Sequence, residues 1–308
     1  MVVSILGHPK VSSFLRKTKL WRNYNSFEVL YNDLPKFFTK ENWDYWRTEC
    51  KVWEQNKNSK WKLVHYYEDT YPKLLKEIYD PPLVLVCLGD LSVLSRELVA
   101  IVGTRKSSPI SLLATKTLVN SFSEKENIAI VSGMALGIDR QAFVTALDIG
   151  IPVLGVLGTT LSIEYPPGNR DLYKRIKSDN KQLLISEFLL QTEPAKWTFP
   201  KRNRVISGLC QKIFIMESGK KSGTISTATS AMEQNREIFV FDHPRQFDNE
   251  GGKMLLRQGA ELLQGECDDK EKQSYDKTIL SYEEWRNQRN SSFLITKEGE
   301  VDDFQFIP

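Results

Sequence analysis

The sequence predicts an α/β protein with a doubly wound, mostly parallel sheet, preceded by a small helical domain. From about residue 83 to residue 263, short apolar segments alternate with helical patterns, as expected when strands and helices follow one another in such a sheet. Several of these segments are apolar almost throughout, which is typical of strands covered on both faces. The chain of 308 residues is too long for one small core, so we expect two domains or one large domain with an appendage.

Residues 1–75 are expected to form the small helical domain. They hold five of the seven tryptophans among lysines and glutamates, with little of the alternation that is typical of strands. Trp43, Trp46 and Trp53 have helix-compatible spacing, and we interpret these rings as the filling of a small core. The prolines at 81 and 82 then interrupt the chain. We expect the second domain at residues 76–265 and an acidic tail at residues 266–308.

Apolar segments give the expected strands, which lie at 83–88, 98–102, 128–131, 152–157, 183–185, 213–216, 238–241 and near 261–263. Helical patterns between them lie at 112–125, 140–147, 171–177 and 225–234. In a doubly wound sheet, ligands bind outside the carboxyl ends of the strands. The turns that follow the strands are therefore the places to look for a site.

The turn after the strand at 98–102 is the first candidate site. It reads GTRKSS from Gly103 to Ser108, so a glycine that permits a tight turn is followed by cations and hydroxyls. The N–H groups at the start of the next helix favour an anion, and Arg105 adds donors for phosphate oxygens. Neither a G-x-G-x-x-G fingerprint nor a P-loop occurs in the chain. The turn predicts a phosphate site, but a plain strand-to-helix turn with solvated charges explains the same residues.

Three further turns bring glycines and hydroxyls to the same edge of the sheet. They follow the strands at 128–131, 152–157 and 213–216, and in the first of them we expect Asp139 to cap the next helix. Each turn alone is weak evidence, because such turns favour Gly and Ser in any fold of this class. Together they predict phosphate-binding turns, whose residues are Gly103, Thr104, Ser132, Gly133, Ser222, Gly223 and Thr224.

Residues 196–208 carry four cations within nine positions, interleaved with two aromatic rings. The cations are Lys196, Lys201, Arg202 and Arg204, and the rings are Trp197 and Phe199. This composition suits single-stranded nucleic acid, because cations meet phosphates and ring faces meet unstacked bases. The competing interpretation is a solvated charged loop whose rings are tucked into the core. In either case we expect a loop at the ligand-binding edge.

Composition narrows the class of protein. Lys and Arg number 42 and Asp and Glu number 39, so the overall charge does not indicate a polyanion partner. The four cysteines are far apart and the three histidines are isolated, so we expect no metal site, no cofactor and no disulfide framework. The chain has no signal-peptide pattern and no apolar run of 18 residues. We therefore expect a cytoplasmic protein that does not bind membranes.

From about Tyr71 to Leu263 the chain resembles the DprA family, also called Smf, of DNA-processing proteins. The matching segments, in the family's order, are YPKLLKEIYDPPLVLVCLGD, VAIVGTR, SGMALGID, VLGTTLSIEYPPGNR, FPKRNRVISGL, SGTISTA and RQGAELL. The resemblance implies an extended Rossmann-like domain that binds single-stranded DNA without sequence preference. It also implies a homodimer that helps to load the RecA recombinase during DNA uptake in natural transformation, or competence.

The resemblance implies roles for individual residues. Arg105 matches an arginine of the family's DNA-binding pocket, Phe199 matches the position that would meet a base, and Lys196 falls where members can carry a DNA-contacting lysine. With the basic residues of the FPKRNR segment, the expected DNA-binding residues are Arg105, Lys196, Phe199, Lys201, Arg202 and Arg204.

The chain departs from the family at three places. Leu136 replaces a common arginine, and Gly168 stands where many relatives carry a charged residue. The 41 residues from 268 to 308 hold ten acidic and six basic side chains. They are too few for the winged-helix-like domain in which family members often end, and their charge is unsuited to DNA.

Two other hypotheses remain open. The first is a nucleotide-binding enzyme, since Lonely-guy phosphoribohydrolases look similar at residues 222–224 but place a catalytic glutamate shortly afterwards. Here no carboxylate follows until Glu233, so we expect no catalytic residues and a binding protein rather than an enzyme. The second keeps the same surface but uses it to sense DNA or nucleotides in defence against mobile elements.

Overall fold

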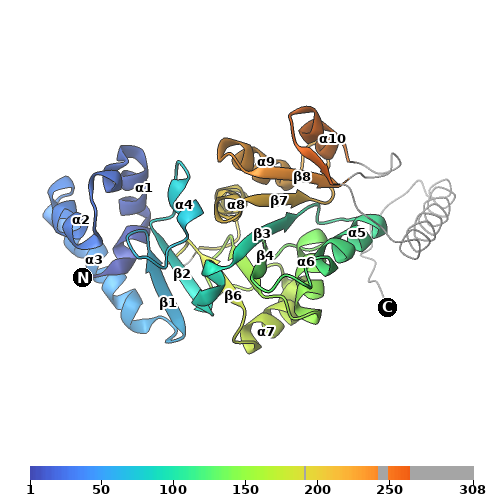
Figure 1. Cartoon of the computed structure of the whole chain (residues 1–308). Coiled ribbons are helices and arrows are strands. Elements are labelled where there is room, and N and C mark those ends of the chain that lie inside the picture. Colours follow the sequence, from blue (N-terminus) through green and yellow to red (C-terminus); the bar gives the residue numbers. More distant parts are fainter. Residues whose placement is uncertain (191, 242–248, 264–308) are drawn as a thin grey trace, which may run out of the picture. The chain divides into compact units, whose positions relative to one another are not determined.

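The computed structural model describes residues 1–190, 192–241 and 249–263, and Met1–Gln264 form one compact unit. Its centre is a nine-stranded sheet in the order β1-β2-β6-β5-β4-β3-β7-β8-β9 (Figure 1). The neighbours from β6 to β9 pair in parallel, whereas β2 is antiparallel to β6 and β1 is antiparallel to β2. This confirms the predicted α/β class and the mostly parallel sheet. The predicted acidic tail lies outside the described residues.

The strands of the sheet lie close to where the apolar segments predict them. They are β2 (Val84–Gly89), β3 (Glu97–Val102), β4 (Ile128–Ser132), β5 (Val153–Leu157), β6 (Leu183–Ser186), β7 (Lys212–Ile215), β8 (Glu237–Phe241) and β9 (Glu261–Leu263). Both faces of the sheet are covered, because alternate residues of one strand enter different cores. In β3, Val99 and Ile101 join one core, and Leu98, Ala100 and Val102 join the other.

Helices pack on both faces of the sheet. One core takes side chains from α5 (Pro109–Asn120), α6 (Ile138–Asp148) and α7 (Arg170–Ser178). The other takes side chains from α4 (Lys73–Glu77), α8 (Thr198–Leu209), α9 (Gly223–Glu233) and α10 (Glu250–Arg257). Two short 3₁₀ helices, η4 (Leu91–Ser95) and η5 (Pro167–Asn169), complete this part of the chain. No helix in residues 1–190, 192–241 and 249–263 is long and apolar enough to span a membrane.

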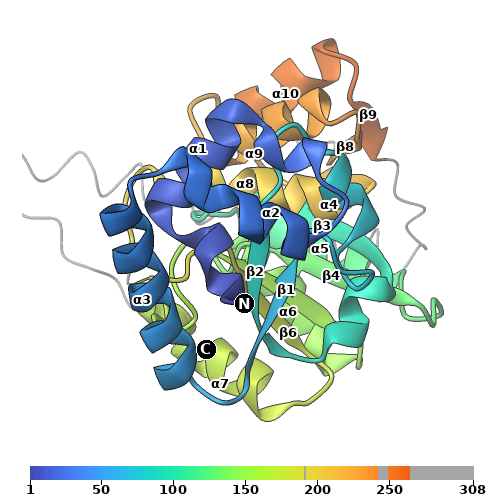
Figure 2. The ribbon, with the colours of Figure 1, turned by 90° about the vertical axis from the view of Figure 1, so that its left-hand side faces the viewer.

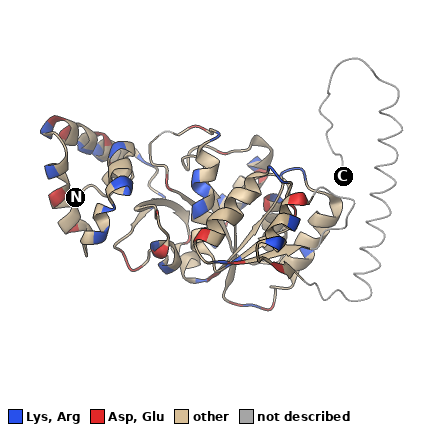
Figure 3. Ribbon diagram, turned by 90° about the horizontal axis from the view of Figure 1, so that it is seen from above, with Lys and Arg blue, Asp and Glu red and all other residues tan. Residues whose placement is uncertain are grey.

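The N-terminal region is helical as predicted, and it lies beside β1 and β2 (Figure 2). Its elements are η1 (Val3–Gly7), α1 (Pro9–Thr18), η2 (Leu20–Asn23), α2 (Phe27–Asp33), η3 (Leu34–Phe37) and α3 (Lys40–Asn56). Trp43 is buried, and Trp46 and Trp53 pack against the same core, which agrees with their interpretation as core residues. Basic and acidic residues are mixed along these helices and along the rest of the coloured ribbon (Figure 3).

Two segments differ from the sequence-based expectation. Residues Trp61–His65 form strand β1 and not a helix, because they pair with β2 in the sheet. Most of the charged segment at 196–208, expected as a loop, belongs to the helix Thr198–Leu209. It is helical because Val205, Ile206 and Leu209 bury an apolar stripe against the sheet. The domain division at residue 75 stays a prediction.

The end of β2 approaches its neighbour closely at Gly89. Its φ is +118°, and a Cβ atom built there would lie 2.0 Å from the carbonyl oxygen of Gln182. Asp90 donates its N–H to that same carbonyl, so the backbone cannot move away without losing a hydrogen bond. Gly150 also has a positive φ, of +80°, but a Cβ atom there would meet nothing within 4 Å. A substitution at Gly150 therefore meets a positive φ without a clash, whereas one at Gly89 meets both.

We expect Gly89→Ala to lower the free energy of unfolding more than Gly150→Ala. The unfavourable φ costs about 1 kcal/mol in each variant, and the clash with Gln182 adds about 1–3 kcal/mol in Gly89→Ala alone. Urea unfolding of both variants measures the difference. Equal losses in the two variants would contradict the close approach.

Candidate nucleic-acid interface

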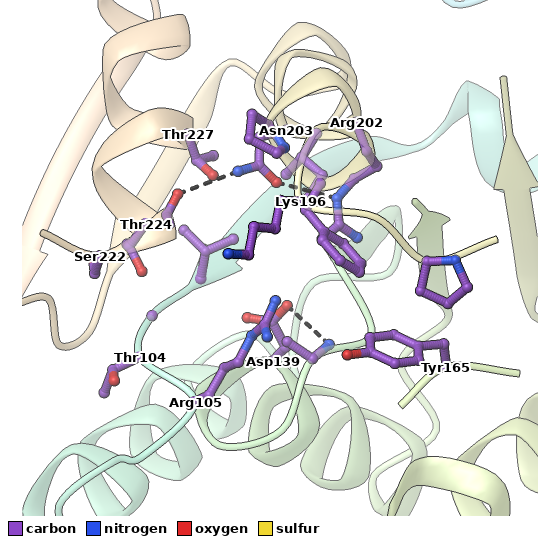
Figure 4. A pocket seen from close by; sticks show the side chains of 18 of the residues that line it. Thr104, Arg105, Asp139, Tyr165, Lys196, Arg202, Asn203, Ser222, Thr224 and Thr227 are labelled. Atoms are coloured by element: carbon purple, nitrogen blue, oxygen red, sulfur yellow. Dashed lines mark hydrogen bonds between the residues drawn. The ribbon is translucent and has the colours of Figure 1, made fainter. Parts of the chain in front are cut away.

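A pocket of about 690 Å³ lies at the carboxyl ends of the strands (Figure 4). The chain runs outward from β3 to β4, β5 and β6, and then returns to place β7 on the other side of β3. The pocket lies at this reversal, where ligands bind in doubly wound sheets. Its walls come from the turn after β3, the turn after β4, the loop before α8 together with α8 itself, and the start of α9. The pocket therefore lies at the edge of the sheet where the sequence predicted a ligand site.

The carboxylate of Glu217 binds the residues that follow β3. The N–H and the hydroxyl of Ser108, at the start of α5, both donate to Glu217 Oε2, at 2.8 and 2.9 Å. The N–H of Thr104 donates to the main-chain oxygen of Glu217 at 2.9 Å. The main-chain N–H of Thr104 and both the N–H and the hydroxyl of Ser108 are therefore engaged by Glu217. A ligand phosphate at this turn would have to be bound by side chains.

Three cations of the pocket wall are exposed and lack a carboxylate partner. Arg105, Lys106 and Lys196 line the pocket, and among the described residues none of them forms an ion pair within 4.0 Å. The guanidinium of Arg105 lies 5.3 Å from the centroid of the half-buried Phe199 ring. That ring lies 5.5 Å from the ring of Tyr165. Positive charge and aromatic surface therefore meet in one hollow, which suits phosphates and bases.

The start of α9 supplies main-chain donors in another part of the pocket wall, where Figure 4 shows Ser222 and Thr224. Ser222 is the N-cap residue, and Gly223 and Thr224 begin the helix. The N–H groups of Gly223 and Thr224 have no main-chain acceptor within the described chain, as expected at a helix start, whereas the N–H of Ser222 donates to the carbonyl of Gly219 at 3.2 Å. A Cβ atom at Gly223 would meet nothing within 4 Å, so this turn opens to solvent. A helix start of this kind favours an anion.

Arg202 lies under the pocket and is only 6% exposed. One of its terminal nitrogens, Nη1, donates to the carbonyl oxygens of Gly133 and Val156, at 2.6 and 2.5 Å. Its Nε donates to Asn203 Oδ1 at 3.1 Å. Burial lowers the pKa of Arg202 to about 10, against the opposing effect of the Asp139 carboxylate. Arg202 therefore joins α8 to the ends of β4 and β5, besides lining the pocket.

Asp139 does not cap a helix as expected. The N-cap residue of α6 is Gly137, and Asp139 lies inside the first turn. Its carboxylate accepts the N–H groups of Gly133 and Ala135, at 3.0 and 3.2 Å, so it closes the turn after β4. Burial raises the pKa of Asp139, and the positive charge of Arg202 opposes that rise. Asp139 lines the pocket as a structural anion between the turn and Arg202.

Lys201 and Arg204 lie outside the pocket, against carboxylates. Glu187 Oε2 is 3.3 Å from Lys201 Nζ and 2.6 Å from Arg204 Nη2. Asp80 Oδ2 is 3.5 Å from Arg204 Nε and 3.9 Å from Nη1 of Arg16 on α1. This ion-pair group connects α8 with the N-terminal helices. The structure therefore separates these two cations from Arg105 and Lys196, although one short segment carries three of the four.

Some of the predicted phosphate-binding turn residues line the pocket and others do not. Gly103 and Thr104 line the pocket. Gly133 lines a neighbouring cavity of about 130 Å³. Ser132 lines neither cavity, because its buried hydroxyl donates to the carbonyl of Ile101 at 2.7 Å.

Sequence reasoning missed Asn203 and Tyr165 in the pocket wall. The side-chain amide of Asn203 donates to the carbonyl of Gly223 at 3.2 Å and so connects α8 with the start of α9. A helical interpretation of residues 198–209 would have found Asn203. Phe199, Arg202, Asn203 and Ile206 have the spacing of one helix face, and all four line the pocket.

The two in-domain departures from the family pattern lie together. A Cβ atom at Gly168 would lie 3.2 Å from Cδ2 of Leu136, and Leu136 lines the smaller cavity. The two positions thus approach each other, and Leu136 lines that cavity together with Tyr165.

Within the described ranges, no histidine or cysteine lines the pocket. His8 is near Glu49 and His65 is near Glu68, whereas His243 and Cys267 lie outside the described residues. Cys50, Cys87 and Cys210 are buried free thiols. In the described part of the chain, no group of three or more His, Cys, Asp or Glu side chains could hold a metal ion.

Comparisons with known proteins agree with this fold. The sequence model of the family described as DNA recombination-mediator protein A matches residues 62–272. DNA processing protein DprA of Streptococcus pneumoniae is 35% identical over 197 residues, which are 64% of this chain and 68% of that protein. Protein Smf of Synechocystis sp. is 37% identical over 203 residues, which are 64% of this chain and 50% of that protein.

Two solved structures resemble the chain. The X-ray structure of DprA from S. pneumoniae has a TM-score of 0.65 and 32% identity, and the match covers 71% of this chain and 78% of that one. A structure of DNA processing protein A from Helicobacter pylori, described for its single-stranded DNA binding mode, has a TM-score of 0.60 and 26% identity. That match covers 72% of this chain and 96% of the other. The predicted extended Rossmann-like fold is thereby confirmed.

The family match covers more than half of the chain, and the pneumococcal relative is matched over more than two thirds of its length. The chain therefore belongs to the DNA recombination-mediator protein A family, which includes the DprA and Smf proteins.

Proposed function

We propose that this protein binds single-stranded DNA in the pocket, without sequence preference, and acts as a recombination mediator that loads RecA. The observation that carries the proposal is that exposed cations with no ion pair among the described residues lie together with the Phe199 ring at the switch point of the sheet. Cations bind any phosphate and a ring face stacks on any base, so neither contact reads sequence. The single-stranded DNA binding described for the H. pylori relative supports this assignment.

The proposed contacts divide between backbone and base. Arg105 and Lys196 bind phosphates with their side chains, and the N–H groups of Gly223 and Thr224 bind a phosphate oxygen at the start of α9. Phe199 stacks on one base. Duplex DNA hides its base faces, so we expect the single strand to bind more tightly.

RecA loading, a homodimer and a cytoplasmic location are parts of the same proposal. They rest on membership of the family, in which DNA recombination mediation is the described function. The use of the protein in natural transformation has the same support. Sensing of DNA in defence would employ the same surface and would differ only in the partner that responds.

We propose a binding rather than a catalytic role for the pocket. Residues 225–228 of α9 carry no carboxylate, unlike the glutamate position of Lonely-guy enzymes. The two buried carboxylates nearby hold main-chain N–H groups, Asp139 in the turn after β4 and Glu217 at the start of α5. Release of a free base from a nucleoside monophosphate would revive the enzyme hypothesis.

We expect Arg105→Ala to weaken binding of a fluorescent oligothymidine by about tenfold or more, because a charge-assisted phosphate contact is lost. The slope of log affinity against log salt concentration should fall in magnitude by about 0.7. Fluorescence anisotropy at several salt concentrations measures both quantities, with the duplex titrated alongside. Arg47→Ala is the control, because Arg47 is an exposed arginine of α3. Equal affinity of the Arg105→Ala and Arg47→Ala proteins would remove Arg105 from the site.

We expect Arg202→Ala to act first on stability. It leaves the carbonyls of Gly133 and Val156 and the buried Asp139 carboxylate without their cation, which costs about 3–5 kcal/mol of unfolding free energy. Urea unfolding measures the loss, and Arg105→Ala should remain within about 0.5 kcal/mol of the wild type because its side chain is exposed. A fully stable Arg202→Ala protein would contradict this structural role.

For Arg204 the geometry supports positioning of α8 rather than the direct DNA contact that the resemblance implies. Arg204→Ala should lower the unfolding free energy by about 3 kcal/mol, since Glu187 loses its closest cation. Its effect on DNA affinity should match that of Arg47→Ala in the same anisotropy assay. A reduced salt slope in Arg204→Ala would instead place Arg204 on a phosphate.

A further inference from the structure

Trp197 is an exposed ring at the rim of the pocket. Its surface is 60% exposed, whereas the other five tryptophans in the described part of the chain are buried or partly buried in the core. Trp197 does not itself line the pocket, but its neighbours Lys196 and Phe199 do. A single exposed ring is common on protein surfaces, so its meaning depends on how the ring is held and what lies beside it.

A closed turn presents Lys196 and Trp197 together to solvent. They are the two central residues of the turn 195–198, in which the N–H of Thr198 donates to the carbonyl of Ala195 at 3.0 Å. The hydroxyl of Thr198 also donates to that carbonyl, at 2.9 Å, and accepts the N–H of Ala195 at 3.3 Å. Three hydrogen bonds therefore fix the backbone under the lysine and the tryptophan.

The ring itself is supported from below. The buried ring of Phe188 meets Trp197 edge to face, with centroids 5.9 Å apart and an interplanar angle of 75°. The ammonium of Lys201 lies 4.8 Å from the centroid of Phe188, and Glu187 pairs with that ammonium. Lys201 thus contacts Phe188, and Phe188 contacts one side of the Trp197 ring. Most of the surface of Trp197 stays exposed.

We propose that Trp197 is a second stacking platform, which binds a nucleobase of the DNA strand just outside the pocket. The inference rests on the proposed single-stranded DNA binding and adds the direction in which the DNA strand leaves the pocket. The ammonium of Lys196, in the same turn as the ring, forms no ion pair with any described residue, so one turn offers a contact for a phosphate and a contact for the adjoining base. The strand runs from Phe199 past Lys196 to Trp197. Base stacking on an exposed ring is independent of sequence, as the proposed function requires.

Oligothymidines of increasing length, from about 2 to about 16 nucleotides, test the proposal by anisotropy with the full chain. Trp197→Ala should weaken binding of the longer strands by about five- to a hundredfold and leave the shortest strands, which fill only the pocket, unaffected. Trp197→Phe should keep most of the affinity, because it retains a ring. Tyr45→Ala is the matched control, since Tyr45 is 66% exposed on α3.

Tryptophan emission gives a second measurement that a merely structural role would not change. DNA should quench the emission of the wild type, and this quenching should be largely lost in Trp197→Phe but kept in Trp53→Phe, whose ring packs in the core. Thermal unfolding of each variant checks that it is folded. Unchanged affinity of Trp197→Ala at every length, with Arg105→Ala impaired, would overturn the platform and leave the proposed function standing. Absence of DNA binding by the wild type would overturn both.

Discussion

The site depends on one buried guanidinium. Arg202 comes from α8, yet its hydrogen bonds end on the carbonyls of Gly133, after β4, and Val156, in β5. Its charge also faces Asp139, whose carboxylate holds the turn after β4 closed. Burying a charge in this way is tolerated only when every partner is present. One side chain therefore fixes two strands, a turn and α8 relative to one another. Because Phe199 belongs to α8, its position in the pocket is fixed as well.

Helical periodicity explains why neighbouring cations have different roles. Lys196 precedes α8 and is exposed at the pocket, whereas Arg202 lies on the helix face that points into the protein. Lys201 and Arg204 occupy another face, where Glu187 neutralises them. In an extended loop all four side chains could reach one ligand. In a helix they diverge, because side chains share a face only at spacings of three or four residues.

The sequence predicted correctly those elements whose structure is decided by neighbouring residues, and it missed those that depend on distant contacts. The strand at 98–102 is evident because both faces are buried and every residue is apolar. Strand β1 is not evident, since its extended form depends on pairing with β2, about 20 residues further along the chain. Membership of the pocket was predictable for Arg105, which directly follows a strand. The engagement of Ser108 by Glu217 joins residues 109 positions apart, and nothing near either residue indicates it.

Glu217 also determines where an anionic ligand can sit. Two helices, α5 and α9, begin after the neighbouring strands β3 and β7. At α5 the carboxylate of Glu217 binds Ser108 and supplies the negative charge that a helix start favours. At α9 the described chain places no carboxylate on Gly223 or Thr224. Because Glu217 already occupies the start of α5, we expect the proposed phosphate contact at the start of α9, in the pocket that Arg105 also lines.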